Sequence, residues 1–140
     1  KRSAIHNIYL NEIDIANIVL LHFPNINLQD LRYRKGKKRE ICFPRQLCHY
    51  FGVLYNVNNT IEIGNYFGGK SHSTVSYSCG IMQKRRSLKV KNKDKDLMEE
   101  IDADIRKLIS NRKFTQREEN NYYGSFDEEI SPISLYHQKP

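Results

Sequence analysis

The stretch from Gly64 to Ser71, GNYFGGKS, is the part of this 140-residue sequence whose residue types and spacing most directly suggest chemistry. It fits the Walker A pattern G-x-x-x-x-G-K-[ST], in which backbone N–H groups surround the phosphates of a nucleotide. A loop of this kind follows a buried strand and leads into a helix within a parallel sheet. The pattern is therefore a hypothesis that depends on the elements around it.

Those surroundings argue against nucleotide binding. The only candidate strand, residues 60–63, contains Glu62, and the loop interior holds Asn65, Tyr66 and Phe67 where small residues suit phosphate contact. No second apolar strand ends in an aspartate that would hold Mg²⁺. Paired carboxylates or a Cys/His set on a predicted cleft are also lacking. We therefore expect neither an NTPase nor another enzyme, and no cofactor.

Helix-turn-helix geometry is the better interpretation of the same residues. We expect a short helix over 60–67, a glycine turn, and a second helix over about 72–86 that is capped by Ser71. The second helix starts with small polar residues and a histidine, as a recognition helix must if it is to reach base edges. The alternative is an ordinary helical hairpin whose polar residues 71–74 only cap and solvate the helix, and periodicity alone favours that alternative. The side chains expected to face the core recur at helical spacing: Val75, Cys79 and Met82.

The rest of the chain is also expected to be helical. Periodicity and breaker residues predict a helix over 12–23 that stops at Pro24, a helix that Pro44 opens and that runs to about Asn56, and a last helix over about 95–110. The remaining C-terminal residues are polar and mixed in sign, so we expect a tail that is disordered by itself. The predicted organisation is an N-terminal extension (1–11), a helical domain (12–110) and a polar tail (111–140).

The positive charge of the chain is concentrated in its middle. The formal net charge is +7, but residues 30–91 carry thirteen basic and three acidic side chains, which gives +10 for that segment. Part of this charge lies in RYRKGKKRE, residues 32–40, which has no apolar period and is expected to be a loop. Such a block indicates an anionic polymer or a membrane surface as partner, the alternative being a solvated basic face.

The cysteines and the hydropathy pattern narrow the class of protein further. The three cysteines are odd in number and have no C-x-x-C spacing, which predicts a reducing compartment and no disulfide framework. Four ligands at the spacing of a zinc finger are missing, so we expect no metal site. No signal peptide and no apolar run of spanning length is found, which predicts a cytoplasmic protein without a membrane partner.

Two motifs give the chain a resemblance to a known family. Pro44-Arg45-Gln46 follows the basic loop, and residues 63–75 read IGNYFGGKSHSTV. The sequence resembles the C-terminal DNA-binding domain of the bacterial replication initiator DnaA, whose signature is P-R-Q followed by I-G-x-x-F-G-G-R-D-H-T-T-V. The spacing between the motifs needs no gap, and the resemblance covers about residues 15–110. It implies an all-α domain whose helix-turn-helix is similar to that of the Trp repressor, here without the ATPase domain that precedes it in the family.

The resemblance implies a role for each residue of the DNA-binding surface. His72 and Ser73 would face bases in the major groove, and Thr74 would contact a base or a phosphate. Arg45 and Gln46 would contact phosphates, which suits the start of a helix because its N–H groups and dipole favour an anion. The loop would bring further cations to the minor groove or the backbone: Arg34, Lys35, Lys37, Lys38 and Arg39.

The sequence also departs from the family pattern. Lys70 replaces an arginine and keeps the charge but loses the planar fork. Ser71 replaces an aspartate that accepts hydrogen bonds from base amino groups, and Ser73 lacks the threonine methyl that can touch thymine. The basic loop is one residue longer, so that either Lys35 or Lys37 is the nearest match to the arginine that enters the minor groove. The DNA box is therefore expected to differ from the family consensus.

From these observations we expect sequence-specific binding of double-stranded DNA. The context would be a replication initiator, or a bacterial or phage regulator that borrows its DNA-reading module. The alternatives are a protein-interaction module that reuses the same fold, and a DNA-binding fragment of a larger initiator or transposase. The aromatic residues of the tail, 111–140, are candidates for docking a protein partner.

Overall fold

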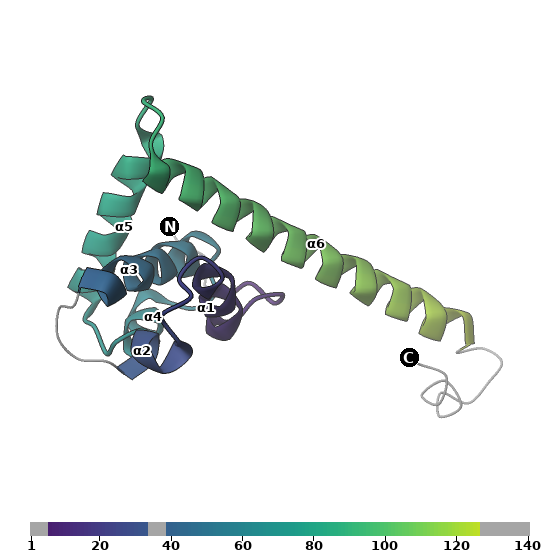
Figure 1. The fold of residues 1–140 in the computed structure, drawn as a ribbon. Helices are drawn as coiled ribbons and strands as arrows, with labels where there is room; N and C mark the ends of the chain where they lie inside the picture. The colour runs from purple at the N-terminus through teal and green to yellow at the C-terminus, as the bar shows by residue number, and fades with distance from the viewer. Residues whose placement is uncertain (1–5, 34–38, 127–140) are drawn as a thin grey trace. The chain divides into compact units, whose positions relative to one another are not determined.

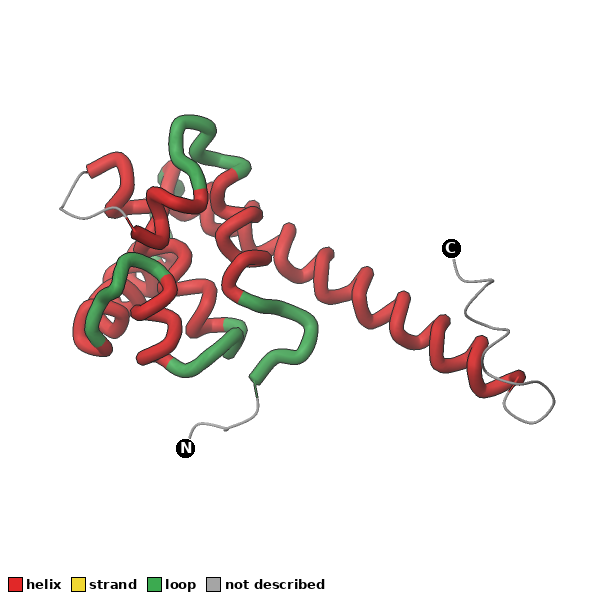
Figure 2. The backbone as a smooth tube through the Cα atoms, turned by 90° about the horizontal axis from the view of Figure 1, so that it is seen from below, coloured by secondary structure: helices red, strands yellow, loops and turns green. Residues whose placement is uncertain are grey.

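A computed structural model of the chain describes the fold of residues 6–33 and 39–126. All regular structure in these residues is helical, and no strand occurs among them (Figures 1 and 2). The predicted all-α class is therefore confirmed. In chain order the helices are α1 (Glu12–Leu20), α2 (Leu28–Tyr33), α3 (Arg39–Leu54), α4 (Thr60–Tyr66), α5 (His72–Ser87) and α6 (Lys93–Phe126).

The chain divides into two compact units, residues 1–106 and residues 107–140. The first unit contains α1 to α5 and the beginning of α6, and α3 is its central helix, with α5 and α1 as its main packing partners. The packing of these helices buries apolar side chains, and burial of apolar surface is the main driving force for folding. Its largest fully buried side chains are Phe51, Phe67, Ile15, Leu31, Leu47, Ile63, Met82, Met98, Ile101 and Ile105.

Short polar side chains start the helices, because they satisfy N–H groups that have no partner within the helix. At α1 the Asn11 side chain accepts from the backbone N–H of Asp14 at 2.9 Å, and the Asp14 carboxylate accepts from the N–H of Asn11 at 3.0 Å. Asn59 and Ser71 accept in the same way at the starts of α4 and α5, at 2.8 and 3.3 Å. The cap predicted at Ser71 is therefore confirmed.

The start of α3 was predicted wrongly. The helix begins at Arg39, and Pro44, which was expected to open it, lies inside it. Proline at this position removes one hydrogen bond of the helix. The earlier start nevertheless places Ile41, which is 4% exposed, in the core beside the buried Pro44. Burial of that side chain, which is worth roughly 1.5–3 kcal/mol, offsets the missing bond.

The last helix is longer than the sequence indicated. A helix was expected over about 95–110, whereas α6 runs from Lys93 to Phe126. Residues 110–120 are all exposed, so this part of the helix has no buried face that apolar periodicity would reveal. No proline interrupts the chain between residues 110 and 126, so nothing in the sequence forces the helix to end earlier. Residues 127–140 lie outside the described residues, and the domain boundary at 110 and the docking role of the tail stay predictions.

A charged network fastens the beginning of α6 to the first unit. The Asp102 carboxylate, on a residue that is 4% exposed, lies 3.0 Å from Nη2 of Arg86 and 3.0 Å from Nε of Arg106, and it accepts a short hydrogen bond from the hydroxyl of Tyr55. Arg86 also forms two bonds to the Glu99 carboxylate, at 3.0 and 3.2 Å, and these bonds raise the pKa of its guanidinium. The network joins side chains of α5 and α6 to Tyr55, the residue that follows α3.

Candidate nucleic-acid interface

The turn between α4 and α5 explains the Walker-like pattern in physical terms. A Cβ at Gly64 would lie 2.3 Å from the carbonyl oxygen of Lys70, whose N–H in turn donates to the carbonyl of Gly64 at 2.8 Å. Gly68 and Gly69 have φ angles of +96° and +60°, which glycine adopts without steric cost. The three glycines therefore form a tight turn between two helices, and no strand precedes them among the described residues.

The second helix of this motif presents a polar first turn. His72, Ser73 and Thr74 are exposed, whereas Val75 and Met82 are fully buried, as predicted. Cys79, which was expected in the buried stripe, is only half-buried, and Ser78 takes a buried position instead. The opening residues of α5 are thus directed to solvent, while one side of the helix packs on the core.

A buried histidine connects this motif to the central helix. His49 on α3 is 1% exposed; its Nε2 lies 3.1 Å from the carbonyl oxygen of Phe67 and its Nδ1 lies 3.1 Å from the hydroxyl of Ser78. Burial lowers the pKa of His49 to about 4, so the ring is neutral near pH 7. Nε2–H then donates to the carbonyl, and Nδ1 accepts from the serine. Sequence reasoning missed this pair.

Arg45 has a structural role that was not predicted. Its side chain is 4% exposed; Nε donates to the carbonyl of Leu31 at 3.0 Å and Nη2 donates to the carbonyl of Asp30 at 2.7 Å. A Cβ at Gly68 would lie 2.6 Å from Nε of Arg45, and the N–H of Gly68 donates to the carbonyl of Arg32 at 3.1 Å. Arg45 therefore holds the end of α2, where the basic loop begins, against the turn that precedes α5.

Four of the predicted contact residues surround one depression. Its volume is about 320 Å³, and none of the residues that line it is acidic. Burial lowers the pKa of Arg45, but a guanidinium stays charged at neutral pH. Arg45 and Lys70 therefore give the depression a positive charge. The lining residues are Arg45, Gln46, Lys70 and Thr74, which were predicted as contacts, and Cys42, His49, Tyr77 and Ser78, which were not.

Tyr77 is the most prominent addition to the predicted surface. It is 66% exposed and lies three residues after Thr74, so the two side chains project from the same side of α5. An exposed aromatic residue on this side of the helix was readable from the sequence, because its spacing from Val75 and Met82 places it away from the core.

The basic loop is only partly described. Arg34, Lys35, Lys37 and Lys38 lie outside the described residues. Arg39 is exposed at the start of α3. Arg32, just before the loop, has its guanidinium carbon 3.8 Å from the ring centre of Tyr66 and 4.8 Å from that of Tyr33, an arrangement that is typical of a cation–π contact. Part of the charge counted in the basic block is therefore engaged within the domain.

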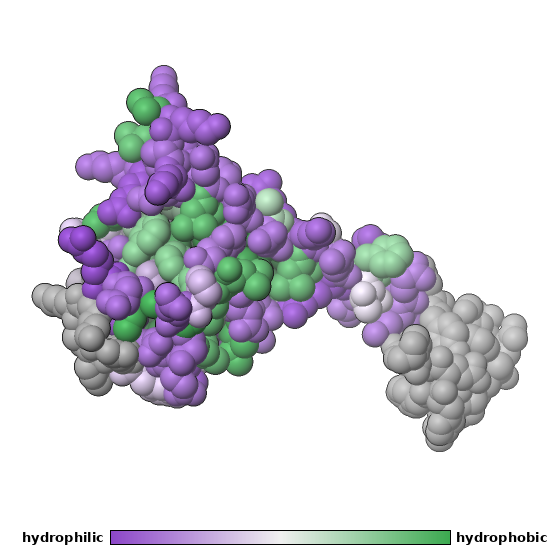
Figure 3. All heavy atoms as spheres, viewed as in Figure 1, coloured by the Kyte–Doolittle hydropathy of each residue, from purple (hydrophilic) through white to green (hydrophobic). Residues whose placement is uncertain are grey.

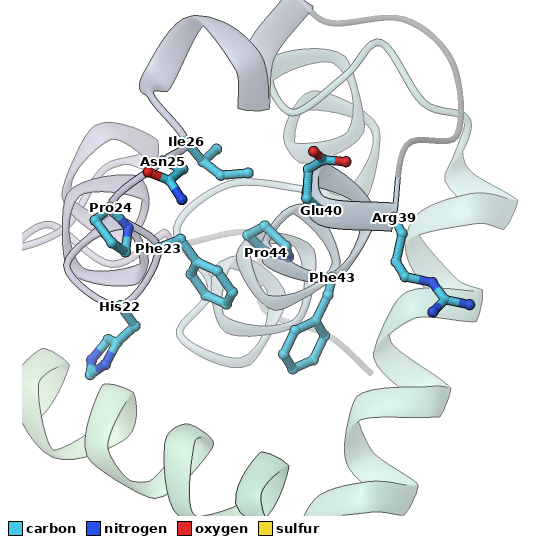
Figure 4. Close-up of a pocket in the computed structure, with 9 residues that line it drawn as sticks. All are labelled: His22, Phe23, Pro24, Asn25, Ile26, Arg39, Glu40, Phe43 and Pro44. Atoms are coloured by element: carbon cyan, nitrogen blue, oxygen red, sulfur yellow. The ribbon is translucent and has the colours of Figure 1, made fainter.

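A second hollow, of about 420 Å³, lies on another side of α3 (Figure 4). The rings of Phe23 and Phe43 meet edge to face across it, with centres 5.9 Å apart, and Pro44 lies beside them. The surface of the first unit shows apolar side chains among hydrophilic ones in the view of Figure 3. The residues that line this hollow and those that line the basic depression have no member in common. This hollow is therefore separate from the basic depression.

Two kinds of site find no support in the part of the chain that the structure describes. No group of three or more His, Cys, Asp or Glu side chains converges there as a metal site would require. The described helices include none that combines the length and the apolar character of a membrane span. What the fold and the surface together define is a helix-turn-helix domain with an exposed polar first turn on its second helix.

Comparisons with known proteins identify the family. Residues 13–81 match the family described as bacterial DnaA protein helix-turn-helix. Over 96 residues the chain is 35% identical to the chromosomal replication initiator protein DnaA of Thermodesulfovibrio yellowstonii, covering 69% of this chain and 20% of that protein. The DnaA proteins of Limosilactobacillus reuteri (38% over 101 residues, 69% and 21%) and Treponema pallidum (42% over 67 residues, 46% and 14%) are similar.

Residues 13–81 therefore belong to the DnaA C-terminal helix-turn-helix family, which confirms the resemblance predicted from the sequence. Membership implies DNA binding. The chain spans about a fifth of the length of these relatives, or less.

Proposed function

We propose that this domain binds a specific sequence of double-stranded DNA, with the first turn of α5 in the major groove. His72 and Ser73 would contact base edges, and Thr74 a base or a phosphate, because a recognition helix reads bases with its N-terminal residues. The observation that carries the proposal is that these side chains are exposed while Val75 and Met82 hold the other side of α5 in the core. Binding rather than catalysis is the proposed activity, in the context of replication initiation or of a regulator that uses the same module.

Lys70, Gln46, Ser71 and the basic loop would supply contacts to the DNA backbone or to flanking bases. Phosphate contacts determine most of the affinity, and base contacts determine the discrimination between sequences. Lys70 lines the non-acidic depression beside Thr74, which favours this division of roles. Arg45 would approach a phosphate only from the depression, since two of its nitrogens donate to backbone carbonyls.

Selection of bound sequences from a random duplex pool tests the proposal directly. We expect one sequence to be enriched, and its affinity to fall about a thousandfold between 50 and 200 mM salt if roughly six phosphates are contacted. No enrichment would favour the protein-interaction alternative. Enrichment with an affinity that does not change with salt would exclude the backbone contacts.

The His72→Ala variant tests the role in base reading. We expect it to lose about 1–3 kcal/mol of discrimination between the selected duplex and a variant of it. His6→Ala, which removes another exposed histidine outside α5, is the matched control and should leave discrimination unchanged. Equal weakening of all duplexes by His72→Ala would mean that His72 contacts only the backbone. Lys70→Gln, by contrast, should weaken all duplexes alike.

A further inference from the structure

Gly80, in the middle of α5, has no evident role in the fold. Gly64 and Gly68 have backbone or side-chain atoms where a Cβ would lie, and at Gly52 a Cβ would meet Ile63 at 3.2 Å. At Gly80, in contrast, a Cβ would meet no described atom within 4 Å outside its own helical turns, and its φ is not positive. Glycine inside a helix is less favourable than any residue except proline. The folded chain therefore gains nothing from a glycine at this position.

The position of Gly80 along α5 relates it to the proposed interface. Gly80 follows His72 by eight residues, or about 12 Å along the helix axis, and it follows Ser73 by seven. At 100° per residue, Ser73 lies about 20° from Gly80 around the axis and His72 about 80° from it, so Ser73 is on the same side and His72 at the edge of that side. Both are exposed, and the buried Met82 lies on the opposite side. The major groove is about 8.5 Å deep. A helix that enters the groove by its first turn, with its axis directed into the groove, therefore has its third turn at the rim.

We propose that Gly80 is a point of close approach between α5 and the sugar–phosphate backbone at the rim of the major groove. Without a Cβ, the helix backbone itself contacts the DNA, so that the first turn reaches the bases; a side chain at this position holds the helix away from them. Lys84, one turn further on the same side and exposed, adds positive charge next to this point. The inference rests on the proposed function, since it requires α5 to lie in the groove.

Two substitutions at Gly80 separate this role from an effect on folding. Alanine and leucine both favour a helix more than glycine does, so Gly80→Ala and Gly80→Leu should each raise the midpoint of thermal unfolding by about 4 °C. With the duplex chosen from the random pool, we expect Gly80→Ala to weaken binding about threefold and Gly80→Leu to weaken it at least about tenfold. Ala103→Leu, at an exposed position of α6, is the matched control for added bulk and should leave the affinity unchanged.

The outcomes distinguish the inference from the proposed function. If the wild-type protein enriches a sequence and Gly80→Leu binds it as tightly as the wild type, the close approach at Gly80 is wrong while the proposed function stands. If the wild-type protein enriches no sequence, both fail. More stable variants that bind the selected duplex more weakly than the Ala103→Leu control would support the inference.

Discussion

The two ends of α5 use their polar residues in opposite ways. At the first turn, His72 and Ser73 are exposed and make no side-chain hydrogen bond or ion pair within the described residues. At the last turn, Arg86 bonds Glu99, Asp102 and Tyr50, and Arg85 lies 3.3 Å from Asp94. The first end is available to a ligand, whereas the second end holds α6 against the domain. In the loop that follows the second end, Leu88 and Val90 are exposed among hydrophilic neighbours.

The comparison shows that net charge alone does not locate a DNA-binding surface. The segment 30–91 carries +10, but Arg45 donates to backbone carbonyls, Arg32 stacks on tyrosine rings, and Arg85 and Arg86 are paired with acids of α6. Part of the positive charge of this segment therefore serves contacts inside the domain, and only the rest is available at the surface.

Removing the Asp102 carboxylate should give the largest loss of stability. This variant tests whether the last turn of α5 has a purely structural role. Asp102→Ala removes a buried carboxylate from the network, but Arg86 keeps its bonds to Glu99. We therefore expect a cost toward the lower end of the range of about 3–5 kcal/mol for breaking a buried pair. We expect that loss in urea unfolding, with an unchanged ratio between specific and non-specific DNA affinity. Asp104→Ala on the same helix is the control and should be nearly neutral. A changed affinity ratio would contradict the division between the two ends.

Gly64→Ala tests the turn that positions the first end. The added Cβ would be 2.3 Å from the Lys70 carbonyl, so the turn must shift, at a cost of about 3 kcal/mol. Gly69→Ala meets no neighbouring atom and should cost only the strain of its φ of +60°, about 1 kcal/mol. Equal costs of unfolding for the two variants would show that close packing at Gly64 does not determine the turn.

Acidification tests the bond between His49 and the turn. The unfolded chain binds a proton at His49 with a pKa near 6.5, whereas the folded chain does so only at about 4. The unfolded state therefore gains more protons as the pH falls, and the contribution of His49 is complete above pH 6.5 and decreases toward pH 4. Between pH 8 and 5 the free energy of unfolding should decrease by about 2 kcal/mol from this group. In the His49→Gln variant this part of the pH dependence should disappear, and if it persists another group is responsible.

Substitution of Ser71 should have the smallest effect on stability. Ser71→Ala removes the cap of α5 and should cost about 1 kcal/mol in thermal or chemical unfolding. Ser71→Asp retains a capping oxygen and supplies the residue type of the family signature, so it should be as stable as the wild type but select a different duplex sequence. If its selected sequence does not change, Ser71 acts only as a cap.

Local patterns in the sequence predicted the parts of the fold that depend on neighbouring residues. The glycine turn, the Ser71 cap and the burial of Val75 and Met82 all follow from spacing within one or two turns of helix. The bond between His49 and Ser78 joins residues 29 positions apart, and the bonds of Arg45 span 14 and 15 positions. Such pairs leave no periodic signal.

The positions at which α3 begins and α6 ends were also not predictable from local sequence patterns. The start of α3 depends on tertiary burial of Ile41 despite Pro44, and α6 continues beyond residue 110 without a core-facing stripe. Family resemblance assigned the contact residues, but it did not indicate that Arg45 would be 4% exposed.

The bonds from Arg45 to the end of α2 set the distance between the start of the basic loop and the turn that precedes α5. The guanidinium of Arg45 bonds the carbonyls of Asp30 and Leu31 and packs against Gly68. The end of α2, where the basic loop begins, and the turn that precedes α5 are therefore held in a fixed position relative to each other. If both segments bind one duplex as proposed, a duplex with one base pair inserted between their contact positions would not fit this fixed distance, even if every individual contact base were retained.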